Sequence, residues 1–463
     1  MSAIIIPEHV LFRIFKYMDP ITLLKLRKIN KYLKELIEQD FGIWRRLILK
    51  TSEITPWKDQ LINLRYPYIK SENYNSLTSE EYQELFFEFI KLSRAKNVFC
   101  VNKLSVIHPS IKKENEIFFD ARGNYFGYFS RTSNYLALFR LDTSEMLIEP
   151  VNIFKYANAQ VADPDGRWLV QQFMMWCPNE NRLFLIFVHV REGLVILDAL
   201  QRRRMKTPTL ISVMPITSPH GHFTFFNLVN NSSGDDIYTL MPIEDTLYHI
   251  VRLRWATKSQ NLVAESVVLF ESPSGFLGMT PMSKVDNSTV SLIYKYQNKD
   301  VLYQAKVPET IISPIRISRN SGIEIFMNNE NRTFNINAHN SQIFTVIDQT
   351  RNRLRIALKL KNGLIKEKSY QLPISENDHV AFVKIFINNL FIFTIQGIVK
   401  VYRLKNPMHL LHLTFDDPPN LKLTLETDIN FENLQYIKIA LKNDKLCLIC
   451  LERHGLIHIL PFQ

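Results

Sequence analysis

The chain has 463 residues, of which 46% are hydrophobic and 22% are charged, and its formal net charge at pH 7 is +11. The length exceeds the roughly 250–300 residues at which one hydrophobic core stops growing, so we expect two or more structural units, or one large repeat fold. The composition excludes a disordered or low-complexity protein, and the charge is compatible with nucleic acid, an acidic membrane surface or an acidic or phosphorylated protein as partner.

The cysteine content and the hydropathy pattern bear on the compartment. Four cysteines in so long a chain indicate a reducing environment rather than a disulfide framework. The N-terminal sequence has no basic segment before its short apolar run, so we expect no signal peptide. A run of about 18 apolar residues is also missing from the sequence, so we expect no membrane span. The predicted location is the cytoplasm, the nucleus or both.

Residues 6–50 predict three or four short helices. Pro7 suits a first helical turn because its fixed φ angle matches a helix. Asp19 and Asn30 can each cap the next helix with a side-chain oxygen. Apolar residues recur at helical spacing along the first two helices, at Val10, Leu11, Ile14, Phe15, Met18, Ile21, Leu23, Leu24, Leu26 and Ile29. These are too many for so small a unit to bury, so some of them must contact a partner.

This stretch resembles the F-box family. The family's successive motif elements correspond here to Ile6-Pro7-Glu8, Ile14-Phe15, Met18-Asp19-Pro20, Leu23-Leu24, Arg27, Ile29, Asp40 and Trp44. Ile6, Asn30 and Leu33 replace the family's common Leu, Cys and Trp, which are changes on the module's own packing face. The resemblance covers only about a tenth of the chain. The alternative is an ordinary helical cap on the following domain.

F-box modules dock on the small Skp-type adaptor of cullin–RING ubiquitin ligases. The resemblance therefore implies a Skp-type adaptor as the direct partner and a cullin–RING ligase as the indirect one. It implies that eight residues supply much of the adaptor interface, namely Pro7, Leu11, Ile14, Phe15, Leu23, Leu24, Leu26 and Ile29.

Residues 51–96 predict a helical linker. Pro56 and Pro67 indicate loops around one short helical turn. Thr78 and Glu81 then form a capping box, and apolar residues follow helical spacing into a basic last turn. The result is one long helix over 77–96, which we interpret as a stiff spacer.

From about residue 97 the apolar period changes from 3.6 to 2. Seven segments read as β-hairpins, at 125–141, 182–198, 237–253, 290–307, 353–372, 390–404 and 445–462. Most are about 50–60 residues apart, a length that suits propeller blades. Gly193, Gly363, Gly397 and Gly455 each begin an alternating strand, which looks like the last hairpin of a WD-type blade without its Trp-Asp and Gly-His pairs.

The predicted fold class is α+β and multidomain. A small helical F-box at 1–50 and a helical linker at 51–96 precede a large all-β domain at 97–463, which we predict to be a seven-bladed β-propeller. A ring of six or eight blades, or two stacked β-sandwiches, are the alternatives.

The sequence offers little catalytic chemistry. Cys447 and Cys450 have metal-ligand spacing, but residues three apart in a strand point to opposite faces, so we expect them in the core. His220 and His222 indicate a polar turn rather than a metal site. Phosphate-loop and nucleophile-elbow motifs are not found in the sequence. We therefore expect no metal, no cofactor and no catalytic residue.

Basic residues supply the remaining binding candidates. Arginine offers a planar fork for carboxylate or phosphate groups, so arginines that converge on one face would suit an acidic or phosphorylated target. The candidates are Arg202, Arg203, Arg204, Arg252, Arg254, Arg316 and Arg319, with a further cluster at Arg351, Arg353 and Arg355. Solvated loops and strand faces are the alternative reading for each cluster.

The predicted function is substrate recognition in an SCF-type ubiquitin ligase, with the β domain presenting a target protein. The first alternative is an F-box scaffold or inhibitor that holds the adaptor without cullin and acts in complex assembly or membrane traffic. Direct nucleic-acid binding, which salt would weaken steeply, ranks below both, and an enzyme in the propeller ranks last.

Overall fold

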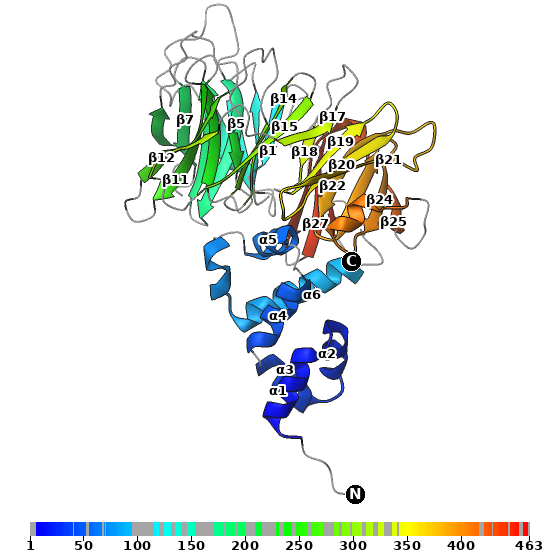
Figure 1. The fold of residues 1–463 in the computed structure, drawn as a ribbon. Helices are drawn as coiled ribbons and strands as arrows, with labels where there is room; N and C mark the ends of the chain where they lie inside the picture. The colour runs from blue at the N-terminus through cyan, green and yellow to red at the C-terminus, as the bar shows by residue number, and fades with distance from the viewer. Residues whose placement is uncertain are drawn as a thin grey trace, which may run out of the picture.

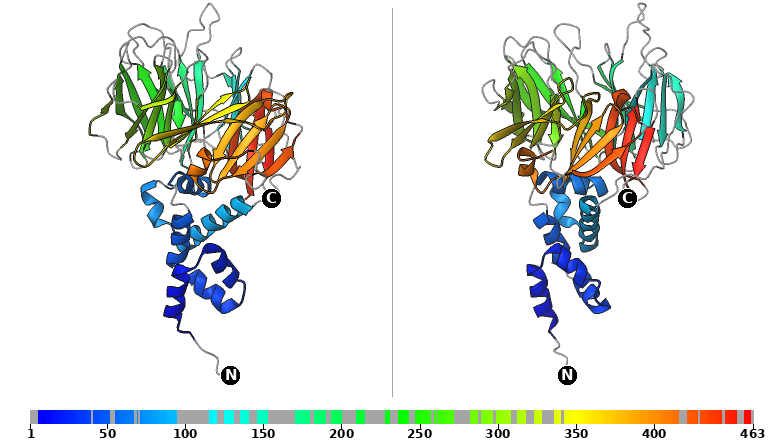
Figure 2. Two further views of the ribbon diagram at one scale, coloured as in Figure 1. Left: turned by 45° about the vertical axis from the view of Figure 1, so that its right-hand side comes forward. Right: turned by 90° about the vertical axis from the view of Figure 1, so that its right-hand side faces the viewer.

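The computed structural model describes residues 6–94 with gaps at 40, 52–54, 67–68 and 70, then short segments between 115 and 339, mainly strands, and residues 342–461 with gaps at 416–420, 428, 443–444 and 453–456. A helical region is followed by a larger all-β region, and the helices stack beneath one side of the sheets (Figure 1). The two further views agree that the first helices lie farthest from the sheets (Figure 2). The predicted boundary between linker and β domain lies outside the described residues.

The helical region consists, among the described residues, of six α-helices and one 3₁₀ turn. They are α1 (Glu8–Tyr17), α2 (Pro20–Leu26), α3 (Lys31–Gln39), α4 (Phe41–Thr51), α5 (Thr55–Arg65), η1 (Ser71–Ser76) and α6 (Ser79–Arg94).

Side-chain caps determine where several of these helices begin. Asp19 Oδ1 accepts a hydrogen bond from the Thr22 N–H at 3.1 Å, and Asn30 Oδ1 accepts one from the Leu33 N–H at 2.8 Å. The predicted capping box is confirmed, because Thr78 and Glu81 each accept a hydrogen bond from the other's backbone N–H.

The prediction for residues 51–75 was wrong in one respect. We expected loops around one short turn, but α5 is an eleven-residue helix. Pro56 lies in its first turn, where a missing N–H breaks no helical hydrogen bond, so this proline starts a helix instead of interrupting one.

The described strands form seven sheets. Sheet 1 contains β1 (Asn115–Phe119), β2 (Tyr125–Ser130), β3 (Tyr135–Arg140) and β4 (Met146–Asn152). Sheet 2 contains β5 (Val170–Asn179), β6 (Arg182–His189), β7 (Gly193–Asp198) and β8 (Thr209–Met214). Sheet 3 contains β9 (Leu228–Asn230), β10 (Asp236–Pro242), β11 (Leu247–Ala256), β12 (Asn261–Glu271) and β16 (Ile315–Ile317). Strand β16 joins the edge of sheet 3 in parallel with β12, whereas the other described pairings are antiparallel.

The remaining sheets follow in chain order. Sheet 4 contains β13 (Met282–Asp286), β14 (Thr289–Tyr296), β15 (Lys299–Lys306) and β17 (Ile323–Met327), and sheet 5 contains β18 (Ile336–Ala338), β19 (Ile343–Asp348), β20 (Arg353–Lys359) and β21 (Ile365–Gln371). Sheet 6 contains β22 (Val380–Phe386), β23 (Asn389–Thr394), β24 (Ile398–Arg403) and β25 (Leu421–Glu426). Sheet 7 contains β26 (Leu434–Lys442), β27 (Lys445–Glu452) and β28 (Ile457–Pro461). Short 3₁₀ turns η4 (Pro407–Leu411) and η5 (Phe431–Asn433) lie between strands of this part.

All seven predicted hairpins are present as antiparallel pairs, one in each sheet. They are β2–β3, β6–β7, β10–β11, β14–β15, β20–β21, β23–β24 and β27–β28. Alternation of apolar and polar residues therefore identified both the pairing partners and the approximate turns.

Hydrophobic side chains join neighbouring sheets. One cluster lies between sheets 2 and 3 around Trp176 and Leu253, and another lies between sheets 3 and 4 around Tyr238 and Tyr303. Sheet 5 contacts sheet 4 through a hydrogen bond from Lys359 Nζ to Gln304 Oε1, and β1 lies beside β5. A further cluster combines residues of sheet 7 with residues of sheet 1, so the last sheet packs on the first.

The largest hydrophobic cluster crosses from the helices into the sheets. It contains residues of α1 to α6 together with residues of sheets 5, 6 and 7. The helical region therefore shares one continuous core with the last three sheets instead of forming a separate globule.

Two glycines allow a test of this packing. Gly363 and Gly397 both have a left-handed φ, at +85° and +90°, but a Cβ on Gly397 would lie 2.3 Å from the Thr427 carbonyl oxygen, whereas a Cβ on Gly363 would meet open space. We expect Gly397→Ala to lower the free energy of unfolding by about 3 kcal/mol, the sum of left-handed strain and a backbone clash.

Urea unfolding measures this loss, and Gly363→Ala is the matched control. The control has only the left-handed strain, so we expect a loss of about 1 kcal/mol. Equal losses for the two variants would contradict the close packing of the β23–β24 turn on the Thr427 segment.

Candidate functional site

The helices α1, α2 and α3 form the outermost unit of the molecule, and their apolar side chains divide between two surroundings. Phe15 and Leu23 are 1% and 0% exposed and belong to the chain's own core. The Phe15 carbonyl oxygen also accepts a hydrogen bond from Arg46 Nη2 at 3.0 Å, which attaches α1 to α4. One side of this unit is therefore used to build the fold.

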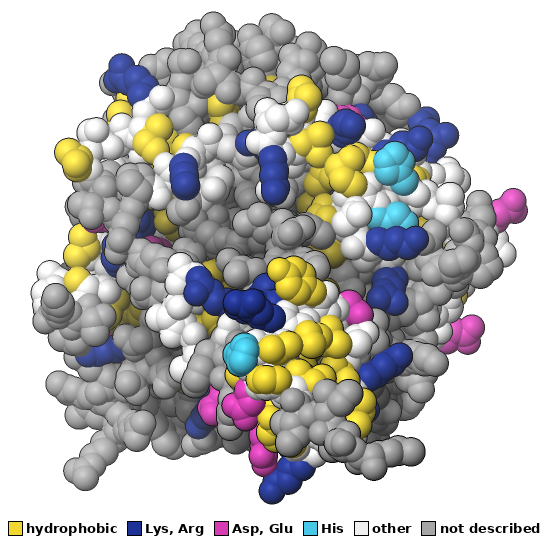
Figure 3. Space-filling view, turned by 60° about the horizontal axis from the view of Figure 1, so that its bottom comes forward, with side chains coloured by type: hydrophobic (Ala, Val, Ile, Leu, Met, Phe, Trp, Pro, Cys, Tyr) yellow, Lys and Arg dark blue, Asp and Glu magenta, His cyan; other side chains and the backbone are white. Residues whose placement is uncertain are grey.

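Other apolar side chains of the same unit are exposed. Seven large hydrophobic side chains are exposed among the described residues, and five of them lie within the first 32 residues, at Ile6, Ile14, Tyr17, Ile29 and Tyr32. Figure 3, which turns the helical end toward the viewer, shows hydrophobic side chains gathered on this face beside charged ones. Exposed apolar side chains concentrated in one stretch of chain are candidate contacts for a protein partner. We call these five residues the apolar surface.

The eight residues predicted for the adaptor interface fall into three groups. Pro7, Ile14 and Ile29 are exposed, and the last two belong to the apolar surface. Three more are half-buried and pack beside the core, namely Leu11, Leu24 and Leu26. Phe15 and Leu23 face inward, so in this conformation they support the surface from beneath. The interface role of all eight stays a prediction.

Sequence analysis missed two members of the apolar surface. Tyr17 is 90% exposed and Tyr32 is 49% exposed. Tyr17 follows Ile14 by three residues and Val10 by seven, so helical periodicity places it at the edge of the apolar stripe of α1 and could have selected it. The Tyr32 hydroxyl donates a hydrogen bond to Glu8 Oε1 at 3.3 Å, which brings α3 against the start of α1.

Exposed lysines lie in the same stretch of chain as this apolar surface. Lys25, Lys28, Lys31 and Lys34 are all exposed on or between α2 and α3, and Lys31 is paired with Glu35 at 3.6 Å. A mixed apolar and basic surface favours a partner that offers apolar pockets bordered by carboxylates.

Arg27 attaches this outer unit to the linker helices. Its Nε donates a hydrogen bond to Glu38 Oε1 at 2.8 Å, and its guanidinium lies over the Phe87 ring of α6, 5.1 Å from the centroid. Trp44 of α4 packs on the same helix, with ring centroids 5.6 Å from Phe86 and 5.7 Å from Phe87. Helix α6 is therefore contacted both by α4 and by the segment that follows α2, and its role as a spacer stays a prediction.

Helix α5 lies between α6 and the sheets. Glu84 of α6 accepts hydrogen bonds from the Tyr66 hydroxyl at 2.8 Å and from Arg65 Nε at 3.3 Å. Burial and the Glu84 carboxylate raise the pKa of Tyr66, so its hydroxyl keeps the proton that it donates. On its other side, Gln60 Oε1 accepts a hydrogen bond from the Ile387 N–H at 2.9 Å.

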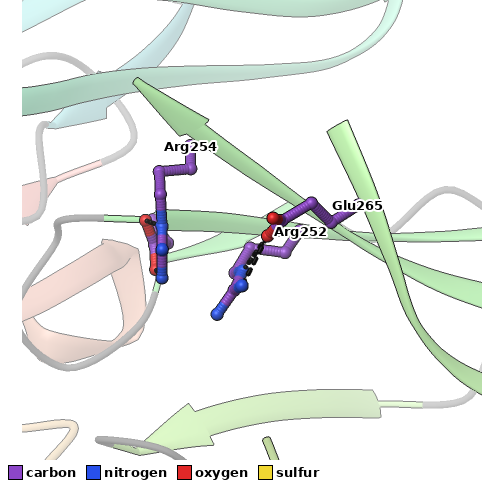
Figure 4. Close-up of polar contacts among 4 residues, drawn as sticks. Arg252, Arg254 and Glu265 are labelled. Atoms are coloured by element: carbon purple, nitrogen blue, oxygen red, sulfur yellow. Dashed lines mark hydrogen bonds and ion pairs between the residues drawn. The ribbon is translucent and has the colours of Figure 1, made fainter. Parts of the chain in front are cut away.

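The arginine candidates Arg252 and Arg254 form ion pairs with carboxylates of neighbouring strands in sheet 3. Arg252 is 2% exposed and forms an ion pair with Glu265 of β12, while Arg254 forms one with Asp236 of β10 at 3.3 Å. Figure 4 shows the Arg252 and Glu265 side chains meeting across β11 and β12 with Arg254 beside them. Both guanidinium groups are therefore neutralised by neighbouring strands, which corrects the expectation of an open basic surface at these residues.

The surroundings of this pair are buried. Tyr238 of β10 pairs with Arg252 of β11, and its side chain belongs to the hydrophobic cluster between sheets 3 and 4. Burial, and then the Asp236 carboxylate, raise the pKa of the Tyr238 hydroxyl to about 12. The arginine pair is thus part of the contact between sheets 3 and 4.

The other arginine candidates are more scattered. Arg316 is exposed on β16. Arg351 and Arg353 are exposed in sheet 5, and Arg355 is half-buried with Glu367 at 3.7 Å. Four candidates lie outside the described residues, namely Arg202, Arg203, Arg204 and Arg319. Convergence of the arginines on one face stays a prediction.

The cysteine pair in sheet 7 is divided as expected. Cys447 belongs to the cluster shared with sheet 1 and Cys450 to the large core on the opposite face, so the two thiols cannot bind one metal. His220 and His222 lie outside the described residues. Within the part of the chain that is described, groups of three or more metal-binding side chains are not found.

The ion pair in sheet 3 leads to a stability prediction. Glu265→Gln removes the negative charge that faces the buried Arg252 guanidinium, so we expect the free energy of unfolding to fall by about 3 kcal/mol. Urea unfolding followed by tryptophan fluorescence measures this loss.

Arg316→Ala is the control, because this side chain is exposed. We expect it to change stability by less than about 0.5 kcal/mol. A Glu265→Gln protein as stable as the control would show that Arg252 does not depend on Glu265.

Comparison with known families agrees with the position of the apolar surface. Residues 4–50 match the family model described as F-box-like, a span that holds α1 to α3 and most of α4. No curated protein is similar enough in sequence to count as a relative. Among the described helices, none combines the length and hydrophobicity that a membrane-spanning segment needs.

Several solved structures resemble this chain weakly. Kluyveromyces lactis Hsv2 is 10% identical with a TM-score of 0.42, over 73% of this chain and 91% of that one. A streptogramin B lyase is 10% identical with a TM-score of 0.40, over 80% and 100% of the two chains. Chaetomium thermophilum Raptor is 10% identical with a TM-score of 0.48, over 98% of this chain and 41% of that one. Likeness at this level supports no inference about function.

Proposed function

We propose that this chain, whose residues 4–50 match the F-box-like family model, is the substrate-recognition subunit of an SCF-type ubiquitin ligase. The F-box binds a Skp-type adaptor, the adaptor joins the chain to a cullin–RING ligase, and the β region binds the target protein. The proposed site of action is the cytoplasm or the nucleus, with which the buried free thiols of Cys177, Cys447 and Cys450 are compatible.

The observation that carries this proposal is the apolar surface. The F-box-like match and the concentration of exposed apolar side chains fall on the same stretch of chain, although one rests on sequence and the other on burial. Exposed isoleucine and tyrosine side chains gain free energy when a partner removes them from water, and such anchors supply most of the energy of an interface.

We also infer that the seven sheets are the blades of one closed β-propeller. Contacts between consecutive sheets support this inference, as does the cluster that sheet 7 shares with sheet 1. Closure would leave only short, protected sheet edges. A ring of this kind would offer a broad, loop-lined face for binding a target.

The proposed mechanism is proximity rather than bond chemistry. F-box proteins are generally non-catalytic subunits of ubiquitin ligases. Holding a target lysine close to the charged ubiquitin carrier raises its effective concentration, which is sufficient to accelerate transfer. The target class we propose is an acidic or phosphorylated protein, in view of the net charge of +11 and the exposed Arg316.

The apolar surface provides the test. Ile14→Asp combined with Ile29→Asp puts two carboxylates on exposed positions, so the fold should be kept while adaptor binding is lost. An interface anchor contributes about 2 kcal/mol, so we expect a loss of roughly thirtyfold in affinity for each substitution. The measurement is capture of the Skp-type adaptor and of cullin by the tagged chain at native abundance, followed by mass spectrometry.

The matched control is Ile312→Asp, at a position that is 96% exposed but far along the chain from the F-box. Wild type and control should retain adaptor and cullin, and proteins retained by all three samples are candidate targets. Adaptor without cullin would replace the ligase proposal with a scaffold or inhibitor. Wild type without adaptor would refute the F-box role itself.

A further inference from the structure

We propose that Gln60 of α5 is a positioning residue, which acts through the turn Ile387–Asn388 between β22 and β23 to fix the β region relative to the F-box. We call Gln60 with this turn the positioning joint. The inference rests on the proposed function, because only a ligase subunit needs its target held at a defined reach from the adaptor.

The turn of the joint is buried, unlike an ordinary hairpin tip. Ile387, Asn388 and Asn389 are 0%, 4% and 2% exposed. Connecting turns normally lie at the surface because water satisfies their backbone groups. Burial of this turn therefore requires another part of the chain to cover it and to supply hydrogen-bond partners.

Gln60 supplies one of those partners. The ladder between β22 and β23 ends at the pair Phe386–Asn389, and the Ile387 N–H donates instead to Gln60 Oε1 at 2.9 Å. This hydrogen bond connects the helical region directly to the sheets, because its two residues are 327 positions apart in the sequence. The Leu404 N–H donates to the Asn388 carbonyl oxygen at 2.8 Å, which ties the other turn residue to β24.

The backbone conformation at Ile387 indicates that the surrounding packing holds this turn in place. Its φ angle is +50°, a region that favours glycine and is rare for a β-branched residue. Such a conformation persists where the surrounding packing requires that particular side chain. The Ile387 side chain belongs to the same core cluster as Trp57, Leu61 and Ile62 of α5.

A series of contacts leads from the joint to the outer helical unit that carries the apolar surface. Glu84 binds α5 to α6, Phe87 of α6 lies under the guanidinium of Arg27, and Arg27 is on the segment that follows α2. Each of these contacts has a defined direction, either a hydrogen bond or a cation over a ring. A change at Gln60 would therefore alter the angle between the two ends of the molecule without touching either binding surface.

Four variants of the full chain in complex with the Skp-type adaptor test this inference: wild type, Gln60→Glu, Gln60→Leu and Gln60→Asn. Glutamate keeps an acceptor oxygen at the same distance along the side chain for the Ile387 N–H. Leucine has no acceptor oxygen, and the side chain of asparagine is shorter by one methylene group, so its oxygen lies farther from that N–H. The Asn variant also provides a second test of the lost hydrogen bond if leucine prevents folding.

Two readouts separate positioning from stability. Spin labels at Glu80→Cys in α6 and Leu364→Cys in the exposed β20–β21 turn report the distance between the helical region and the sheets. Cys100 is replaced by serine so that it takes up no label, and the native Cys177, Cys447 and Cys450 are buried. In parallel, the cullin–RING module and its ubiquitin carrier are added, and mass spectrometry identifies which lysines of the chain itself accept ubiquitin.

We expect wild type and Gln60→Glu to give one narrow distance peak and one restricted set of modified lysines. Gln60→Leu and Gln60→Asn should lose the narrow peak and shift the set, with adaptor capture unchanged. A wild-type peak and an unshifted set in both variants would overturn the positioning role. If wild type captures no adaptor, the proposed function fails, while the distance peak of the free chain still decides whether Gln60 holds the joint.

Discussion

The continuous hydrophobic core between the helices and the last three sheets is the constraint on which the rest of this structure depends. Side chains from α1 to α6 and from sheets 5, 6 and 7 bury one another, so neither region completes its own core. Dispersion and the hydrophobic effect act over short range and require close contact. The helices must therefore sit at one place beneath the sheets, and polar contacts such as that of Gln60 with Ile387 select the orientation within that place.

The limited space in the shared core also explains why some apolar side chains of the outer helices are exposed. The unit of α1 to α3 has more apolar side chains than it can bury, and the inward ones, such as Phe15 and Leu23, join the shared core. The outward ones, such as Ile29 and Tyr17, remain in water, which is unfavourable for an isolated chain and favourable for one that has a partner. The apolar surface is thus what remains after the fold has buried the side chains that its core needs.

Local patterns in the sequence predicted local structure well and long-range contacts poorly. The capping box at Thr78 and the seven hairpins depend on neighbouring residues, and all were found. Helix α5 was missed because Pro56 has opposite meanings in a loop and in a first helical turn. The roles of Arg252 and Gln60 could not be predicted, since each depends on a partner that only the strand register or the docking of the helices brings near.

The shared core also has a consequence for synthesis on the ribosome. The helices up to Arg94 leave the tunnel first, yet the sheets that cover them extend to Leu460. At about 5–20 residues per second, the intervening chain takes roughly 20–70 s to make. Throughout that interval the helical region exposes both the side chains of its future core and its apolar surface. The nascent chain therefore needs protection from aggregation, and an early-binding adaptor would cover one of the two faces before the sheets arrive to cover the other.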